Sequence, residues 1–262
     1  MSNRLAVIIV GELRTWERCA PYTLTLFDNV DYQVDYFFST WTVNVTDTGP
    51  QPVTEQHILA PFQHKNLNCV YSLHEPIGTK VTTYYNKAYL SKMGNILKRQ
   101  KEIEENFVYD QVVEIRPDVY YRPHWKFFKT IVNESELLID GGFFMSHHNY
   151  PGVGDVYYRS TSLTNDIMSN RYYHRKSHSH YSYMHNTGCL EKFHNHHLIL
   201  ADYILDHRLI VLPTQDIQEP HLAVRYDVPQ NLDFNPMDLQ EAKEKYQPFK
   251  GPQPPKFPII WH

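Results

Sequence analysis

Residues 109–121 read YDQVVEIRPDVYY, and this stretch indicates the fold more strongly than any other part of the sequence. The segment from Gln111 to Ile115 predicts a short buried strand, which runs directly into the charged pair Arg116 and Asp118. Pro117 ends the regular strand pairing there because it has no backbone N–H to donate. A carboxylate at the C-terminal end of a strand lies where open α/β sheets bind their ligands. The alternative interpretation is a surface ion pair that merely follows the strand.

Predicted strands and helices alternate along the rest of the chain. Residues 5–10 (LAVIIV) are a continuous apolar run, as expected of a central parallel strand that is covered on both faces. Residues 34–41 (VDYFFSTW) are a second β-rich run, and residues 84–106 have the apolar spacing of an amphipathic helix. This alternation predicts an α/β fold, with a doubly wound, mostly parallel sheet flanked by helices. Further predicted elements are strands near residues 69–73, 137–139 and 143–145, a short helix that ends near residue 168, and a helix over residues 188–206.

The composition is that of an ordinary globular protein. The 262 residues suit one domain, predicted over residues 1–242, followed by a proline-rich extended tail over residues 243–262 that packs on it. The net charge of −4 does not indicate nucleic-acid binding. The longest aliphatic run is far shorter than a membrane span and no signal-peptide pattern is present, so we expect a cytoplasmic protein without a transmembrane segment. The widely spaced cysteines, 3 in number, are predicted to be free thiols.

Two polar segments are predicted to lie outside the regular elements. Residues 44–56 hold two prolines and are predicted to form a loop, and residues 171–187 are predicted to form a long loop or lid. Seven of the 16 histidines lie between His174 and His197. Imidazole suits transition metals such as zinc, so a metal site within residues 174–197 is one interpretation and a polar lid is the other.

In a doubly wound sheet, side chains that follow different strands meet at one edge. Four segments lie at predicted C-terminal strand ends, so we expect them to share a crevice: Gly11, Thr40, the turn from Arg116 to Asp118, and the loop after Asp155. The sequence contains no Gly-x-Gly-x-x-Gly dinucleotide motif, no Gly-x-x-x-x-Gly-Lys-Ser/Thr phosphate loop and no Gly-x-Ser-x-Gly nucleophile elbow. These absences disfavour a dinucleotide oxidoreductase, a P-loop nucleotidase and an α/β-hydrolase.

Five short motifs follow one another in a set order. They are Gly11-x-x-Arg14, Thr40-Trp41, Tyr109-Asp110 with Arg116-x-Asp118, Gly154-Asp155-x-Tyr157, and Glu191 near the start of a late helix. In order and spacing, over about residues 5–210, they resemble a group of nucleotide-sugar-dependent glycosyltransferases of the GT-A type, which occur in capsule, lipopolysaccharide and viral glycan gene sets.

The resemblance implies a GT-A-like nucleotide-binding domain and assigns roles on the donor side. Gly11, Arg14, Thr40 and Arg116 would contact the nucleotide, although Arg116 has the alternative of pairing with a neighbouring carboxylate. Asp118 would bind a divalent metal, Mn²⁺ or Mg²⁺, because such ions prefer carboxylate oxygens. The chain departs from the family here, because the usual Asp-x-Asp motif is replaced by Arg-Pro-Asp with a single carboxylate.

Two acidic residues are the candidates for catalysis. Asp155 lies in a Gly-Asp turn, where the resemblance implies a base for the acceptor hydroxyl and where an Asx-type turn is the alternative. Glu191 lies near a helix start, where a sugar contact or catalytic role competes with simple stabilisation of the helix N-terminus. The implied function is transfer of a sugar from a nucleotide-sugar donor to a glycan or other hydroxyl acceptor. A catalytically inactive nucleotide-sugar-binding protein and a His-metal hydrolase that uses residues 174–197 are the alternatives.

Overall fold

The computed structural model describes most of the N-terminal half of the chain and several segments of the C-terminal half. The described residues are 3–46, 49–76, 84–120, 132–139, 143–145, 151–153, 157–174, 200, 203–204, 207–213 and 222–223. The predicted tail over residues 243–262 and its boundary at residue 242 lie outside them. Of the predicted helix over residues 188–206, only Leu200, Tyr203 and Ile204 are described; they are helical and buried.

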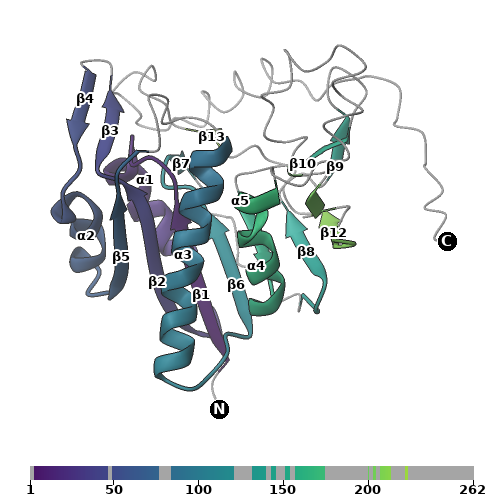
Figure 1. Ribbon diagram of the computed structural model, residues 1–262. Helices are drawn as coiled ribbons and strands as arrows, with labels where there is room; N and C mark the ends of the chain where they lie inside the picture. The colour runs from purple at the N-terminus through teal and green to yellow at the C-terminus, as the bar shows by residue number, and fades with distance from the viewer. Residues whose placement is uncertain are drawn as a thin grey trace, which may run out of the picture. The chain divides into compact units, whose positions relative to one another are not determined.

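A seven-stranded sheet forms the centre of the described residues (Figure 1). From one edge to the other its strands are β5 (Cys69–His74), β2 (Gln33–Trp41), β1 (Arg4–Val10), β6 (Gln111–Ile115), β11 (Tyr157–Ser160), β8 (Glu136–Ile139) and β12 (Ile210–Pro213). Neighbouring strands are parallel except at β11, which runs antiparallel to both β6 and β8. Numbered in chain order within the sheet, the strands lie in the order 3-2-1-4-6-5-7. The predicted α/β fold with a mostly parallel sheet is confirmed.

Strand β1 lies between β2 and β6 in the interior of this sheet and is buried on both faces. Residues 5–10 are completely buried, as their continuous apolar run predicts. Because side chains alternate along a strand, Val7 and Ile9 face one hydrophobic cluster and Ile8 and Val10 face another. The sheet is therefore covered by helices on both faces.

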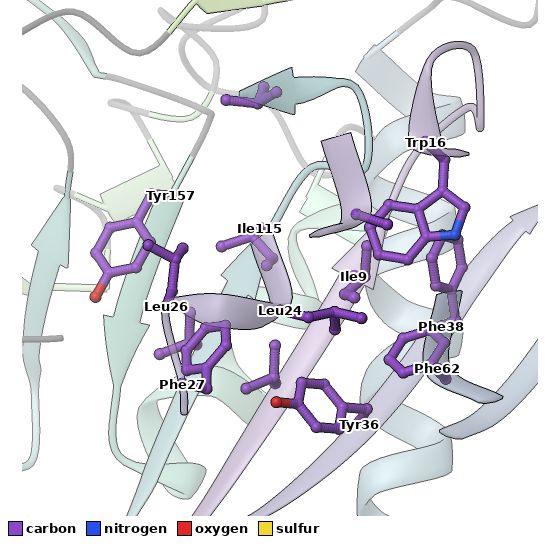
Figure 2. Packing of buried hydrophobic residues seen from close by; sticks show 14 of the residues in the cluster. Ile9, Trp16, Leu24, Leu26, Phe27, Tyr36, Phe38, Phe62, Ile115 and Tyr157 are labelled. Atoms are coloured by element: carbon purple, nitrogen blue, oxygen red, sulfur yellow. The ribbon is translucent and has the colours of Figure 1, made fainter. Parts of the chain in front are cut away.

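The first face is covered by α1 (Trp16–Thr25) and α2 (Glu55–His64), whose rings pack with those of β2. Figure 2 shows this cluster, in which Trp16 meets Phe38 edge-on with ring centroids 5.0 Å apart. Phe62 of α2 lies against Tyr36, with centroids 5.4 Å apart. These aromatic contacts anchor both helices to the sheet by burying large apolar surfaces.

The opposite face is covered by the long helix α3 (Tyr84–Glu104), which crosses in front of β1 and β2 in Figure 1. The helix approaches β1 closely at Gly94, where an added Cβ would lie 2.6 Å from Ile8 Cγ2 and 3.3 Å from Val10 Cγ1. A residue without a side chain is therefore required at this contact. The predicted helix over residues 84–106 is confirmed to within two residues.

The buried side of α3 is partly polar, and α4 (Ser162–Ser169) supplies its partners. Lys98 is fully buried, and its ammonium donates hydrogen bonds to Ser162 and, at 3.0 Å, to Asp166. Glu102 accepts hydrogen bonds from Ser162 Oγ at 2.6 Å and from the backbone N–H of Tyr109 at 3.0 Å. Buried charges are stable only when paired in this way, so the network fixes α4 against α3.

Two segments predicted as loops contain regular structure. Within residues 44–56, most of β3 (Val43–Thr46) pairs with β4 (Gly49–Pro52) in a hairpin, and α2 begins at Glu55. The prediction was wrong here because backbone pairing of a hairpin does not require an apolar pattern. The predicted lid at 171–187 begins with a short helix, α5 (Arg171–His174), and its remainder lies outside the described residues. The other small sheets pair β9 (Phe143–Met145) with β10 (Pro151–Val153), and β7 (Val119–Tyr120) with β13 (Leu222–Ala223).

Candidate functional site

The connections that leave β1 and β6 meet at the C-terminal edge of the sheet. Ile9 pairs with Ile115, so the two neighbouring strands end side by side. The next strands along the chain, β2 and β5, lie on one side of β1 in the sheet, whereas β6 lies on its other side. The direction in which strands are added therefore reverses between β1 and β6. Open α/β sheets bind their ligands at such a reversal of strand order, beyond the carboxyl ends of the strands.

Gly11 brings these two loops into contact. Its φ of 137° is one that residues with a side chain rarely adopt, and its N–H donates to the carbonyl of Ser39 at 3.3 Å. An added Cβ would lie 3.2 Å from Pro117 Cδ, closer than side-chain atoms normally pack. Gly11 is therefore required for the close approach of the β1 loop to the β6 loop. The role that the sequence assigned to it, a close backbone approach to the nucleotide, stays a prediction.

Arg14 extends from the β1 loop and joins two carboxylates. Its backbone has a φ of 37°, and its N–H donates to Asn44 Oδ1 at 2.9 Å. Its Nε and Nη2 atoms lie 2.8 Å from Glu12 Oε2, and its Nη1 donates to Asp118 Oδ2 at 2.8 Å. The guanidinium is therefore held in one orientation between the two loops, because three of its donors have fixed acceptors.

Arg116 and Asp118 form a two-pronged ion pair within the β6 loop. Arg116 Nε donates to Asp118 Oδ1 at 2.8 Å, and Nη2 donates to Oδ2 at 2.7 Å. Parallel bonds of this kind are the strongest arginine–carboxylate contacts. Burial alone would raise the pKa of Asp118, but the charges and hydrogen bonds of Arg116 and Arg14 outweigh it and hold that pKa below its ordinary value. Asp118 is therefore ionised at neutral pH.

We call Glu12, Arg14, Arg116 and Asp118 the arginine–carboxylate cluster. The Glu12 and Asp118 side chains are 6% and 3% exposed, whereas those of Arg14 and Arg116 are 18% and 20% exposed. The carboxylates are thus buried more deeply than the arginine side chains that contact them. An arrangement of this kind presents fixed cationic hydrogen-bond donors to an anion.

Sequence reasoning placed Gly11, Arg14, Arg116 and Asp118 together, and the structure brings all four together. It did not assign a role to Glu12, although the residue lies inside the same Gly-x-x-Arg turn. An acidic residue two positions before an arginine is too common a pattern to indicate a contact by itself.

The remaining candidates do not join the cluster or lie outside the described residues. Thr40 lies in β2 and is fully buried, so its side chain does not reach the surface at this edge. Asp155 and Glu191 lie outside the described residues, as does the histidine-rich segment after His174. Among the described residues, no three His, Cys, Asp or Glu side chains are grouped so as to hold a metal ion.

Aromatic side chains gather at the same edge of the sheet, on the face covered by α3. Tyr89 stacks on Trp41 with ring centroids 5.8 Å apart and meets His74 and Tyr172 edge-on at 5.3 and 5.5 Å. Burial lowers the pKa of His74, so its imidazole is neutral at pH 7. The half-buried rings of Tyr89, His74 and Tyr172 offer flat apolar surface beside polar atoms.

Comparisons with known proteins add no assignment for this chain. No protein-family model matches it, and no curated protein matches it. Within the described part of the chain, no helix has both the length and the apolar character that a membrane crossing needs.

Proposed function

We propose that this protein is a GT-A-type glycosyltransferase that transfers a sugar from a nucleoside-diphosphate sugar to a glycan or other hydroxyl acceptor. The observation that carries the proposal is the arginine–carboxylate cluster, which joins Arg14 from the β1 loop to Arg116 and Asp118 from the β6 loop. The two loops flank the reversal of strand order, the position at which α/β sheets bind nucleotides.

The chemistry of sugar transfer suits this arrangement. As the glycosidic bond to the diphosphate breaks, negative charge builds up on the departing phosphate oxygens. Donors that are already oriented toward that position stabilise the charge without having to reorganise during the reaction. A guanidinium has five N–H donors, and the three contacts of Arg14 described above leave it two more for a phosphate oxygen.

The acceptor side of the proposal is based on the sequence alone. Asp155 is proposed as the base that takes the proton of the attacking hydroxyl, and Glu191 as a second acidic residue at the sugar. On this proposal, Asp155→Ala abolishes transfer and leaves the affinity for the donor within a few-fold of wild type. An equal loss of donor binding would move Asp155 to the donor side.

A thermal-shift panel of UDP, GDP and CDP sugars tests the donor assignment, because a ligand that binds the folded state raises the apparent melting temperature. We expect one nucleotide class to stabilise the wild-type protein, and we expect Arg14→Gln and Arg116→Gln to lose most of that shift. No stabilisation by any member of the panel, with or without Mn²⁺ or Mg²⁺, would refute the proposal.

Arg4→Gln is the matched control for these variants. Arg4 begins β1, roughly 20 Å from the opposite end of the strand, and its guanidinium pairs with Glu105 at 2.9 Å. This change removes the same charge at the opposite edge of the sheet, so the ligand-induced shift should persist. Loss of the shift in Arg4→Gln as well would show that net charge, rather than the cluster, governs binding. Release of the nucleoside diphosphate from the stabilising donor then measures turnover.

A further inference from the structure

The carboxylate of Asp118 is a poor ligand for a divalent cation as the structure holds it. A carboxylate has about four lone-pair positions, and three of those of Asp118 already accept N–H donors from Arg14 and Arg116. Mg²⁺ demands near-octahedral coordination at about 2.0–2.1 Å and keeps several of its water molecules. The side chain is only 3% exposed, so the one lone-pair position that these contacts leave gives a hydrated ion little access.

The charges around Asp118 oppose a metal in the same way. Two guanidinium groups contact this carboxylate at 2.7–2.8 Å, and each would repel a divalent ion placed on it. The same two groups attract an anion, and their side chains are less buried than the carboxylates of the cluster. The residues of this site therefore fit a phosphate and do not fit the metal that the family resemblance implies.

We infer that the arginine–carboxylate cluster binds a phosphate group of its ligand directly, with no metal ion on Asp118, and that Asp118 positions the two arginines. The inference rests on the proposed function only in naming the phosphate as part of a nucleotide sugar. Asp118 connects a residue of the β1 loop to a residue of the β6 loop, so it sets the spacing between the two cationic groups. Because the arginine side chains are already fixed, less conformational entropy is lost when the ligand binds.

Inorganic pyrophosphate is the probe that separates this inference from the proposed function. We expect calorimetric titration to show that pyrophosphate binds the wild-type protein in excess EDTA, and that added Mg²⁺ does not improve its affinity after allowance for magnesium pyrophosphate in solution. Arg14→Gln and Arg116→Gln should each weaken binding by about tenfold or more, the scale of one charge-assisted hydrogen bond. Arg4→Gln should bind as the wild type does.

Mn²⁺ alone is the second probe, followed through the electron paramagnetic resonance signal of the free ion. We expect wild type and Asp118→Asn to leave the same amount of Mn²⁺ free. If Asp118→Asn does not fold, the wild-type protein is compared with buffer that contains the same Mn²⁺ concentration and no protein. An equal free-ion signal in the two samples supports the inference equally well. Pyrophosphate binding that requires a divalent ion, absence of pyrophosphate binding in EDTA, or Mn²⁺ binding that disappears in Asp118→Asn would each overturn it.

The two proposals fail in different ways. A protein that binds pyrophosphate in EDTA but responds to no nucleotide sugar retains the phosphate site and loses the glycosyltransferase assignment. A protein that is stabilised by a nucleotide sugar only in the presence of Mn²⁺ or Mg²⁺ retains the assignment and loses the metal-free site.

Discussion

Replacing Gly11 by alanine should both destabilise the protein and disturb the arginine–carboxylate cluster. An alanine at a φ of 137° costs on the order of 1–3 kcal/mol of unfolding free energy, because L-residues rarely adopt this conformation. The added Cβ would also lie 3.2 Å from Pro117 Cδ, and such overpacking costs about 1–3 kcal/mol more. The structure therefore predicts a total loss of about 2–6 kcal/mol for Gly11→Ala.

Gly49→Ala is the control that separates the two contributions. Gly49 has a φ of 104°, and an added Cβ there meets nothing within 4 Å, so only the backbone cost applies. Urea unfolding followed by tryptophan fluorescence measures both variants. We expect Gly11→Ala to be the less stable by about 1–3 kcal/mol, the overpacking term alone.

Pro117→Ala tests whether the excess cost arises from the proline ring. This substitution removes Cδ, so Gly11→Ala should cost less in the Pro117→Ala background, with a coupling energy of about 1–3 kcal/mol. If Gly11→Ala is no less stable than Gly49→Ala, or if the double-mutant cycle shows no coupling, the close approach of the two loops is not what requires glycine. The pyrophosphate affinity of Gly11→Ala should also fall, because displaced loops separate the two arginines.

Three further experiments probe contacts of the sheet and of the site. Gly94→Ala should lower the unfolding free energy by about 1–3 kcal/mol in urea titrations, because its Cβ would overlap Ile8, and an unchanged midpoint would contradict the close packing of α3 on β1. The wild-type stability contributed by Asp118 should be present above about pH 4, the ordinary pKa of an aspartate, and should be lost as the pH falls through its lower folded-state pKa. Asp118→Asn should therefore show a shallower loss of stability as the pH falls below about 4. An identical profile would show that Asp118 is not held ionised by the arginines. Glu114→Gln should cost about 3–5 kcal/mol because it leaves the buried Arg171 without its 2.8 Å carboxylate partner, whereas Glu114→Gln with Arg171→Met should cost much less; equal costs would show that the charge pairing is unimportant.

Apolar pattern and chain order were enough to predict the central part of the fold. Residues 5–10 of β1 are a continuous apolar run because both faces of the sheet are covered there. Strands β2 and β6 are rich in aromatic and β-branched residues, which favour strands. The same order predicted that Gly11, Arg14, Arg116 and Asp118 would meet at one edge. Strands that run parallel place their following loops together, whatever residues those loops contain.

Elements whose apolar pattern is weak or interrupted were not predicted. Helix α1 contains Pro21 and helix α2 contains Pro61, residues that in a sequence usually indicate the end of a helix. Both helices form because Trp16, Phe62 and their neighbours bury aromatic surface against the sheet. Packing energy of this kind comes from partners on other elements, so no local pattern reveals it.

Polar contacts inside the fold depended on the tertiary structure most of all. From its charge alone, Lys98 would be expected to face solvent. It is buried because Ser162 and Asp166 of α4 accept hydrogen bonds from its ammonium group. Arg14 pairs with Asp118, 104 positions further along the chain, and thereby becomes a fixed group. A charged side chain is stable in the interior only where an opposite charge and hydrogen-bond partners surround it. Because those partners are distant in sequence, folding alone decides which charged residues become parts of the site and which remain on the surface.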